Sequence, residues 1–161
     1  MAEVERAARR ALDEVRHAIA GYRAPSLSEE LETATRTLGV AGIETTVSPA
    51  DGPIPAAAET LLAWAVREAA TNVLRHSRAR RCWIGLRVDE AAATLEVRDD
   101  GRAGHAPDAA RSTRRPDAAA GNGLAGLAER IGGAGGRLEV GALPGGGYRL
   151  RALVPLEGVL P

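Results

Sequence analysis

Aromatic side chains are scarce in this chain of 161 residues, and that shortage limits what its core can be built from. Phenylalanine is absent, and the aromatic residues are Tyr22, Trp64, Trp83 and Tyr148. A chain of this length is typical of one domain and can bury about 70% of its unfolded surface. We therefore expect a core filled mainly by Ala, Leu and Val.

Composition excludes several chemistries. All 21 basic residues are arginines, so no P-loop, kinase-strand or Schiff-base lysine exists. The single cysteine, Cys82, permits neither an internal disulfide nor a cysteine-cluster zinc site, and it fits a reducing compartment. The formal net charge of zero gives no support for nucleic-acid or acidic-membrane partners. Without a membrane-spanning run or a signal peptide at its start, the chain is expected to be a cytoplasmic domain without membrane contact.

The hydrophobic pattern alternates between helical and strand periods. We expect helices over 3–20, 26–38, 57–77 and 121–132, the second capped by Ser26 or Ser28. We expect strands over 43–47, 81–88, 93–98, 137–141 and 148–154, with an aperiodic loop over 102–120. The closely spaced second and third strands indicate antiparallel pairing. The predicted fold is a two-layer α/β sandwich, with three helices on one face of a mixed sheet of about five strands.

The helix expected over 57–77 carries a polar face beside its apolar stripe. Glu68, Asn72, Arg75 and His76 follow at helical spacing, so they lie within about two turns of one another. One reading is a solvated surface. The other is a magnesium–triphosphate site, because Mg²⁺ takes few protein oxygens and the two basic side chains would neutralise phosphate charge.

Two glycine-containing motifs follow. Asp99-Asp100-Gly101 ends a strand and would ordinarily form a hairpin turn, but a carboxylate there can also accept the exocyclic amine of adenine. The segment 121–130 begins Gly-Asn-Gly and continues as a helical pattern. It is either a flexible link or a helix N-terminus whose free N–H groups bind an anion without lysine.

Together, in this order, the motifs resemble the ATP-binding domain of sensor histidine kinases in the GHKL superfamily, whose fold is the Bergerat sandwich. Residues 68–77 look like its N box, 99–101 like its first glycine box and 121–130 like its second. The likeness covers about residues 10–156. It is closest to the subfamily that signals to NarL/LuxR-type response regulators. Residues 135–140 and 145–150 resemble the last two strands of that subfamily.

The resemblance implies a role for each matching residue. Glu68 would be the catalytic residue, acting beside the metal or as a base. Asn72 would bind Mg²⁺, Asp99 would hold adenine, and residues 102–120 would form a lid. The full set of implied ATP-binding residues is Asn72, Arg75, His76, Asp99, Gly101, Gly104, Gly121, Asn122, Gly123, Leu124, Ala125 and Gly126.

The resemblance also implies how the chain is organised and what it does. Residues 1–24 would be the end of the second helix of a dimerisation and phosphoacceptor domain with its linker, and 25–161 the catalytic domain. The domain would transfer the γ-phosphoryl group of ATP, with Mg²⁺, to a histidine. It would do so within a homodimeric kinase that can be membrane-anchored and that passes the group to a response regulator.

The family's acceptor, a histidine followed by an acidic residue, is not found in this sequence, where His17 precedes Ala18. The chain alone is therefore expected to bind ATP without phosphorylating itself. Two alternatives stay open. One is an anti-sigma-type serine kinase of the same fold, and the other is an interaction module that binds no nucleotide.

Overall fold

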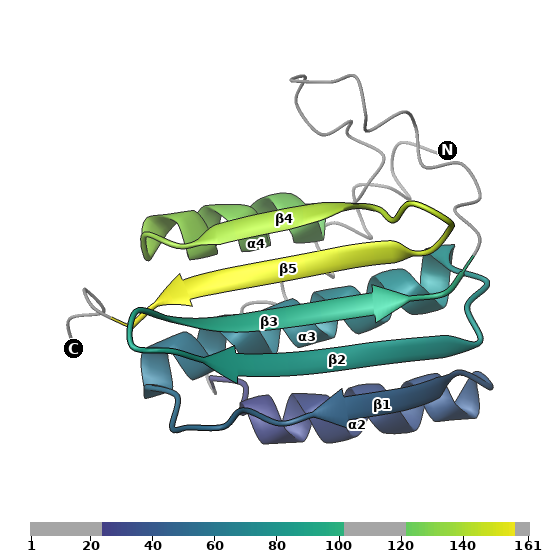
Figure 1. Cartoon of the computed structure of the whole chain (residues 1–161), viewed down its shortest axis with the longest axis horizontal. Helices are drawn as coiled ribbons and strands as arrows, with labels where there is room; N and C mark the ends of the chain where they lie inside the picture. The colour runs from purple at the N-terminus through teal and green to yellow at the C-terminus, as the bar shows by residue number, and fades with distance from the viewer. Residues whose placement is uncertain (1–23, 102–121, 157–161) are drawn as a thin grey trace, which may run out of the picture.

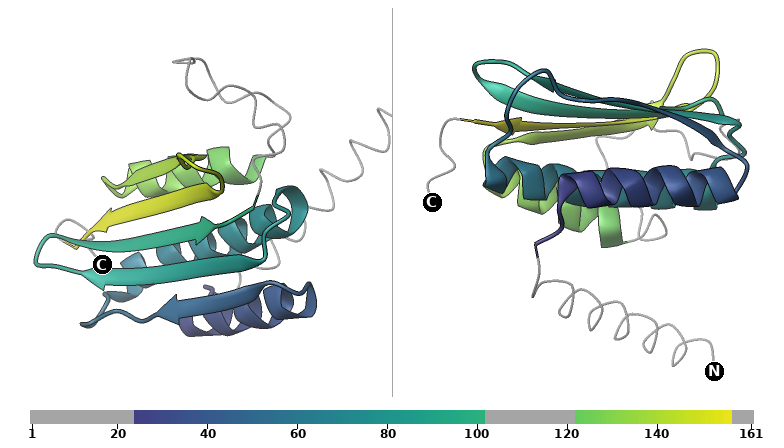
Figure 2. Two further views of the ribbon diagram at one scale, coloured as in Figure 1. Left: turned by 45° about the vertical axis from the view of Figure 1, so that its right-hand side comes forward. Right: turned by 90° about the horizontal axis from the view of Figure 1, so that it is seen from below.

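The computed structural model describes residues 24–101 and 122–156, which form a mixed sheet with helices on one face (Figures 1 and 2). The elements in chain order are α2 (Leu27–Val40), β1 (Glu44–Ser48), α3 (Ala56–His76), β2 (Arg81–Val88), β3 (Ala92–Asp99), α4 (Asn122–Gly133), β4 (Arg137–Ala142) and β5 (Tyr148–Pro155). The helix expected over 3–20 and the loop expected over 102–120 lie outside the described residues.

The five strands pair in the order β1-β2-β3-β5-β4. β1 runs parallel to β2, and the other three pairs are antiparallel. Seen from below, the three helices form a second layer under a single face of the sheet (Figure 2). The predicted two-layer sandwich of five strands and three helices is confirmed, and the predicted bounds differ from the observed ones by one or two residues.

The core lies between the two layers and contains no aromatic side chain among its buried residues in the described segments. The central helix α3 packs against β3 and β5 and contributes eight buried residues, five of them alanines. Small side chains let the helix lie close to the sheet, and leucine, isoleucine and valine from the strands fill the remaining space. The expected core of Ala, Leu and Val is therefore what the structure has.

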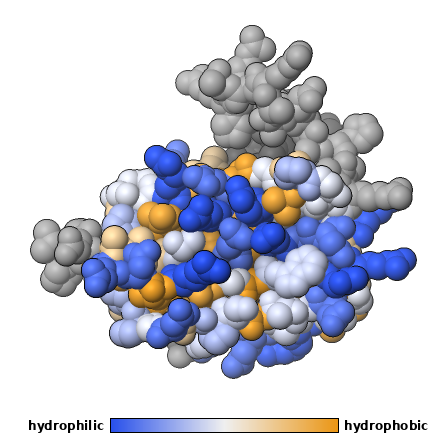
Figure 3. All heavy atoms as spheres, in the orientation of Figure 1, coloured by the Kyte–Doolittle hydropathy of each residue, from blue (hydrophilic) through white to orange (hydrophobic). Residues whose placement is uncertain are grey.

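The opposite face of the sheet carries no helix and is largely hydrophilic (Figure 3). Its outward side chains include Arg87, Arg98 and Trp83, and Trp83 is 39% exposed and is the cross-strand partner of Arg98. A largely antiparallel sheet that is packed on one side and solvated on the other explains the alternating burial along its strands.

The start of α2 differs in detail from the sequence prediction. Ser26 is the residue at the N-cap position, but its hydroxyl makes no bond to the helix backbone. It pairs instead with the hydroxyl of Ser28, at 2.9 Å. Capping by a serine side chain is therefore wrong here, because the two neighbouring hydroxyls bond to each other.

Two glycines before β5 have left-handed backbones for different reasons. Gly147 has a φ of 91°, and a Cβ placed on it would lie 2.0 Å from the carbonyl oxygen of Asp99. Gly146 has a φ of 107°, but the nearest atom to its Cβ would be 3.9 Å away. Gly146 serves only the turn, whereas Gly147 also lets β5 approach the end of β3.

This difference predicts unequal costs for the same substitution. Both Gly147→Ala and Gly146→Ala place a Cβ in the left-handed region, but only Gly147→Ala drives that Cβ into a backbone carbonyl. We expect Gly147→Ala to lower the free energy of unfolding by about 1–3 kcal/mol more than Gly146→Ala. Urea titration followed by circular dichroism measures both. Equal losses would show that the strands do not need this close approach.

Candidate functional site

A small cavity lies between α3 and the sheet, at the C-terminal end of β3. Its volume is about 10 Å³, close to the smallest space that holds one water molecule. The residues that line it are Ala69, Asn72, Val73, Val97, Asp99, Tyr148 and Leu150. The structure thus brings together two residues, Asn72 and Asp99, that the sequence marked separately on a helix and on a strand.

Asn72 enters the cavity from the last turns of α3. Its Nδ2 atom is buried and donates to no acceptor among the described residues. A buried amide group without a partner costs about 1–3 kcal/mol. The donor therefore remains available to a water molecule or a ligand in the cavity.

Asp99 is the last residue of β3 and is only 4% exposed. Its Oδ1 accepts a hydrogen bond of 2.8 Å from the Gly101 N–H, and the Ser77 side chain also bonds to it. None of the ion pairs found in the described segments involves Asp99. Burial therefore raises the pKa of this carboxyl, although the two hydrogen bonds oppose the shift.

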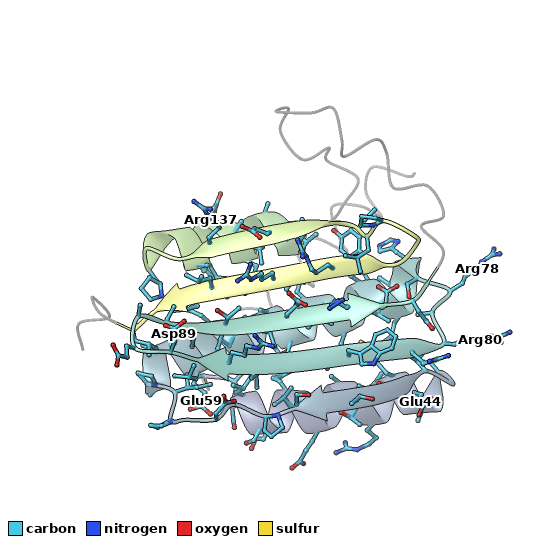
Figure 4. The ribbon with its side chains drawn as sticks, in the orientation of Figure 1. Glu44, Glu59, Arg78, Arg80, Asp89 and Arg137 are labelled. Atoms are coloured by element: carbon cyan, nitrogen blue, oxygen red, sulfur yellow. The ribbon has the colours of Figure 1, made fainter. Side chains whose placement is uncertain are left out.

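The neighbouring Asp100 points the other way and holds the chain in place. Its Oδ1 accepts the backbone N–H groups of Arg80 and Arg81, each at 2.8 Å, while the side chain of Arg80 extends away from the sheet (Figure 4). Both bonds lower the pKa of Asp100, and the bond from Arg81 has the larger effect. The second aspartate thus ties the α3–β2 turn to the end of β3.

The hairpin interpretation of Asp99-Asp100-Gly101 is wrong. β3 already pairs along both edges, with β2 and with β5, so a strand starting after Gly101 would have no free edge of β3 to join. Gly101 has a different requirement. A Cβ on it would lie 2.8 Å from Asp99 Oδ1 and 2.9 Å from Ser77 Cβ, so only glycine fits beside the buried carboxylate.

Asp99 lies in a cross-strand row on the inner face of the sheet. Cys82 of β2 pairs with it on one side and Tyr148 of β5 on the other. Burial first, then the charge of Asp99, raises the pKa of the Cys82 thiol to about 12 and raises that of Tyr148. Tyr148 lines the cavity but was not among the predicted site residues. Its place directly after three glycines, at the start of the last strand, was the available signal.

Glu68 lies one turn before Asn72 and faces the beginning of α4. A Cβ on Gly123 would be 2.4 Å from both oxygens of the Glu68 carboxylate, so the two residues are in direct contact. The first turn of α4 has no acidic residue of its own. Glu68 therefore supplies the negative charge that favours a helix N-terminus.

The other predicted site residues in the described segments do not line the cavity. Arg75 and His76 end α3 with exposed side chains. In α4, Leu124 packs against the core, Ala125 is exposed and Gly126 is half-buried. Gly104, Gly121 and the side chain of Asn122 lie outside what the structure describes.

A set of contacts across the helical layer fixes α4 against α3. The guanidinium of Arg130 in α4 lies 4.9 Å from the ring centre of Trp64 in α3, and that of Arg67 lies 4.8 Å from the same ring. Arg67 also pairs with Glu30 of α2. Cation–π contacts of this kind contribute about 0.5–1 kcal/mol each at exposed sites. Trp64 thus links α3 to α4 through Arg130, and Arg67 links α3 to α2 through Glu30.

This fold is that of a known class of ATPases. Residues 57–158 match the family described as histidine kinase-, DNA gyrase B- and HSP90-like ATPase. The chain therefore belongs to this family, as the motifs predicted. No helix of the described segments is long and apolar enough to cross a bilayer.

Individual relatives are sensor kinases. The chain is 30% identical over 131 residues to the sensor histidine kinase YvfT of Bacillus subtilis strain 168, a match covering 80% of this chain and 33% of YvfT. It therefore spans about a third of this curated relative. Among solved structures, the blue-light activated histidine kinase of Erythrobacter litoralis EL346 superposes with a TM-score of 0.60 at 26% identity, over 81% of this chain and 40% of that one.

A third likeness is one of fold. Full-length ShkA, solved in complex with AMPPNP, superposes with a TM-score of 0.60 at 24% identity, over 80% of this chain and 29% of that chain.

The buried charge of Asp99 leads to a prediction about stability. Because its pKa is raised in the folded chain, its favourable contribution is full below its ordinary pKa and is lost as the pH rises through the raised value. At neutral pH, Asp99→Asn should therefore leave the melting temperature unchanged or raise it by up to about 4 °C, roughly 1 kcal/mol. The difference should shrink as the pH falls toward about 4.

Thermal unfolding of both proteins across this pH range measures the effect. A variant that melts well below the wild type at neutral pH would show that the carboxylate stabilises the fold.

Proposed function

We propose that this chain binds ATP with Mg²⁺ and acts as the catalytic domain of a sensor histidine kinase. One observation carries the proposal: a buried carboxylate and an unpaired buried amide, on different elements, line the same cavity. Neither group is explained by the stability of the fold. Family membership and the likeness to sensor kinases support the same function.

Asp99 would recognise the base. A buried carboxylate with no cationic partner in the described segments can accept the amine of adenine, and a hydrogen bond to a charged group contributes about 1.5–3 kcal/mol. The aliphatic walls supplied by Val97 and Leu150 suit the apolar faces of a purine. Since the cavity is only about 10 Å³, the base must widen it on entry.

The side-chain oxygen of Asn72 would hold the metal. The described residues include no group of three His, Cys, Asp or Glu side chains able to hold an ion by themselves. A single carboxamide oxygen nevertheless fits Mg²⁺, because this ion keeps several waters and takes its remaining ligands from substrate phosphates. When bound, the ion would neutralise charge on the phosphates. The Nδ2 group of Asn72, a donor without a partner in the described segments, would be free to donate to a phosphate oxygen while the side-chain oxygen faces the metal.

The remaining residues would act on the phosphates. The N-terminus of α4, with glycines in its first turns, would offer backbone N–H groups to the anion next to the Glu68 carboxylate that contacts Gly123. Arg75 and His76, exposed at the end of α3, would add positive charge from the side. Glu68 would serve beside the metal or as a base toward the acceptor imidazole. Such transfer depends mainly on positioning and charge neutralisation.

The whole protein would be a homodimeric cytoplasmic kinase, or the cytoplasmic part of a membrane-anchored one. Residues 1–24 would end its dimerisation and phosphoacceptor domain, and 25–161 would be the catalytic domain. The phosphoryl group would pass to a histidine and then to a response regulator of the NarL/LuxR type. The motifs support this assignment, and the likeness to the sensor histidine kinase YvfT supports the kinase part of it.

Nucleotide binding is tested by calorimetric titration with ATP and Mg²⁺. We expect the wild type to bind and Asp99→Asn to bind about 10–100-fold more weakly, the equivalent of one charged hydrogen bond. Asp100→Asn is the matched control. Asp100→Asn keeps a side-chain oxygen that can accept hydrogen bonds from the Arg80 and Arg81 N–H groups. It should therefore change the affinity for ATP less than about threefold.

If the wild type takes up no ATP, the alternative of a nucleotide-free interaction module gains support. Equal affinities of Asp99→Asn and the wild type would remove adenine recognition from Asp99.

Phosphoryl transfer is tested with labelled ATP. Because this sequence lacks the expected acceptor motif, we expect the chain alone to retain no acid-labile label after incubation. Adding a separate protein that contains the dimerisation and phosphoacceptor domain of the same kinase should restore label on that second protein. Acid-labile label on the isolated chain would contradict the proposed division of labour, and acid-stable label would point to a serine kinase.

A further inference from the structure

Tyr148 lies beside the proposed adenine-binding carboxylate but has no role in the function described so far. We infer that Tyr148 is a specificity-determining residue, whose ring closes the base end of the cavity and limits the substituents that the purine amine can carry. This inference rests on the proposed function, because it concerns the same cavity.

The backbone fixes where Tyr148 stands. It is the cross-strand partner of Asp99, so the two Cβ atoms are neighbours on the inner face of the sheet. Directly before it, Gly147 packs so closely on Asp99 that no Cβ would fit between them. β5 is paired with β3 through Tyr148 itself, so the strands stay together there and space beside Asp99 comes from rotation of the Tyr148 side chain.

The other walls of the cavity are less able to yield. Ala69, Val73, Val97 and Leu150 are buried members of the core cluster, and Asp99 is held by its bonds to Gly101 and Ser77. The remaining two walls, Asn72 and Tyr148, are half-buried. Tyr148 is the larger of these and the one beside the carboxylate, so an entering purine must turn its ring aside and then pack against it.

This geometry has a consequence for ligand choice. If Asp99 accepts a hydrogen bond from the adenine N6 amine, a group attached to N6 lies beside Asp99 in the cross-strand row. Of the two neighbours of Asp99 in that row, Tyr148 lines the cavity and Cys82 does not. A bulky group there would clash with the Tyr148 ring, because β3 and β5 stay paired. ATP should therefore be accepted and N6-benzyl-ATP rejected, even though the latter keeps one N–H for Asp99.

The test compares ATP and N6-benzyl-ATP, each with Mg²⁺, by calorimetric titration. We expect the wild type to bind N6-benzyl-ATP at least about 100-fold more weakly than ATP, a difference of roughly 2.7 kcal/mol. Tyr148→Ala should bind N6-benzyl-ATP at least about tenfold more tightly than the wild type does, while its affinity for ATP stays within about tenfold.

Two controls isolate the ring. Tyr148→Phe keeps the ring and removes the hydroxyl, and Arg149→Ala changes the next residue of β5, which points to the opposite face of the sheet. Both should discriminate against N6-benzyl-ATP as strongly as the wild type. Circular dichroism establishes that each variant is folded, and Tyr148→Leu replaces Tyr148→Ala if the alanine variant is not.

Unchanged discrimination in a folded Tyr148→Ala or Tyr148→Leu variant that still binds ATP would overturn the inference. So would relaxed discrimination in Tyr148→Phe, which would assign the effect to the hydroxyl. A wild type that binds neither nucleotide would instead contradict the proposed function itself.

Discussion

The burial of one carboxylate is the constraint around which the rest of this structure is arranged. Asp99 ends the central strand β3 at 4% exposure, with hydrogen bonds from Gly101 and Ser77 but no cation paired with it in the described segments. Placing a charge there works against folding. A buried charge that faces a cavity is typical of a ligand-binding site. Membership of this ATPase family supports our proposal that the ligand is a nucleotide.

The surrounding elements are built to tolerate this charge and to leave a ligand access to it. Alanines let α3 lie close above β3 and β5, which brings Asn72 to the same cavity as Asp99. Glycines have a similar effect elsewhere. Gly101 leaves room for the carboxylate, and Gly147 lets β5 pack against the backbone of Asp99. The fold thus positions the site mainly through small residues, which suits a chain with four aromatic side chains.

Much of this could be predicted from the sequence, because the determining signals are local. The helical and strand periodicities of the hydrophobic residues predict the elements, and helical spacing predicts that Asn72 lies near Glu68. Other features depend on contacts between distant segments, which periodicity does not contain. The contact of Glu68 with Gly123 joins α3 to α4, and the place of Tyr148 beside Asp99 follows from the pairing of β5 with β3. The expected serine cap at α2 was wrong for a smaller reason, since two adjacent hydroxyls can satisfy each other.

The most direct test of the central claim is the pKa of Asp99 itself, measured by carbon-13 NMR of its carboxyl group with and without ATP and Mg²⁺. In the free chain the pKa should lie above the ordinary value of an aspartate, because the group is buried. Bound nucleotide should lower it, since an amine that donates to the carboxylate favours the ionised form. An ordinary pKa in the free chain, or one that ATP leaves unchanged, would contradict the account.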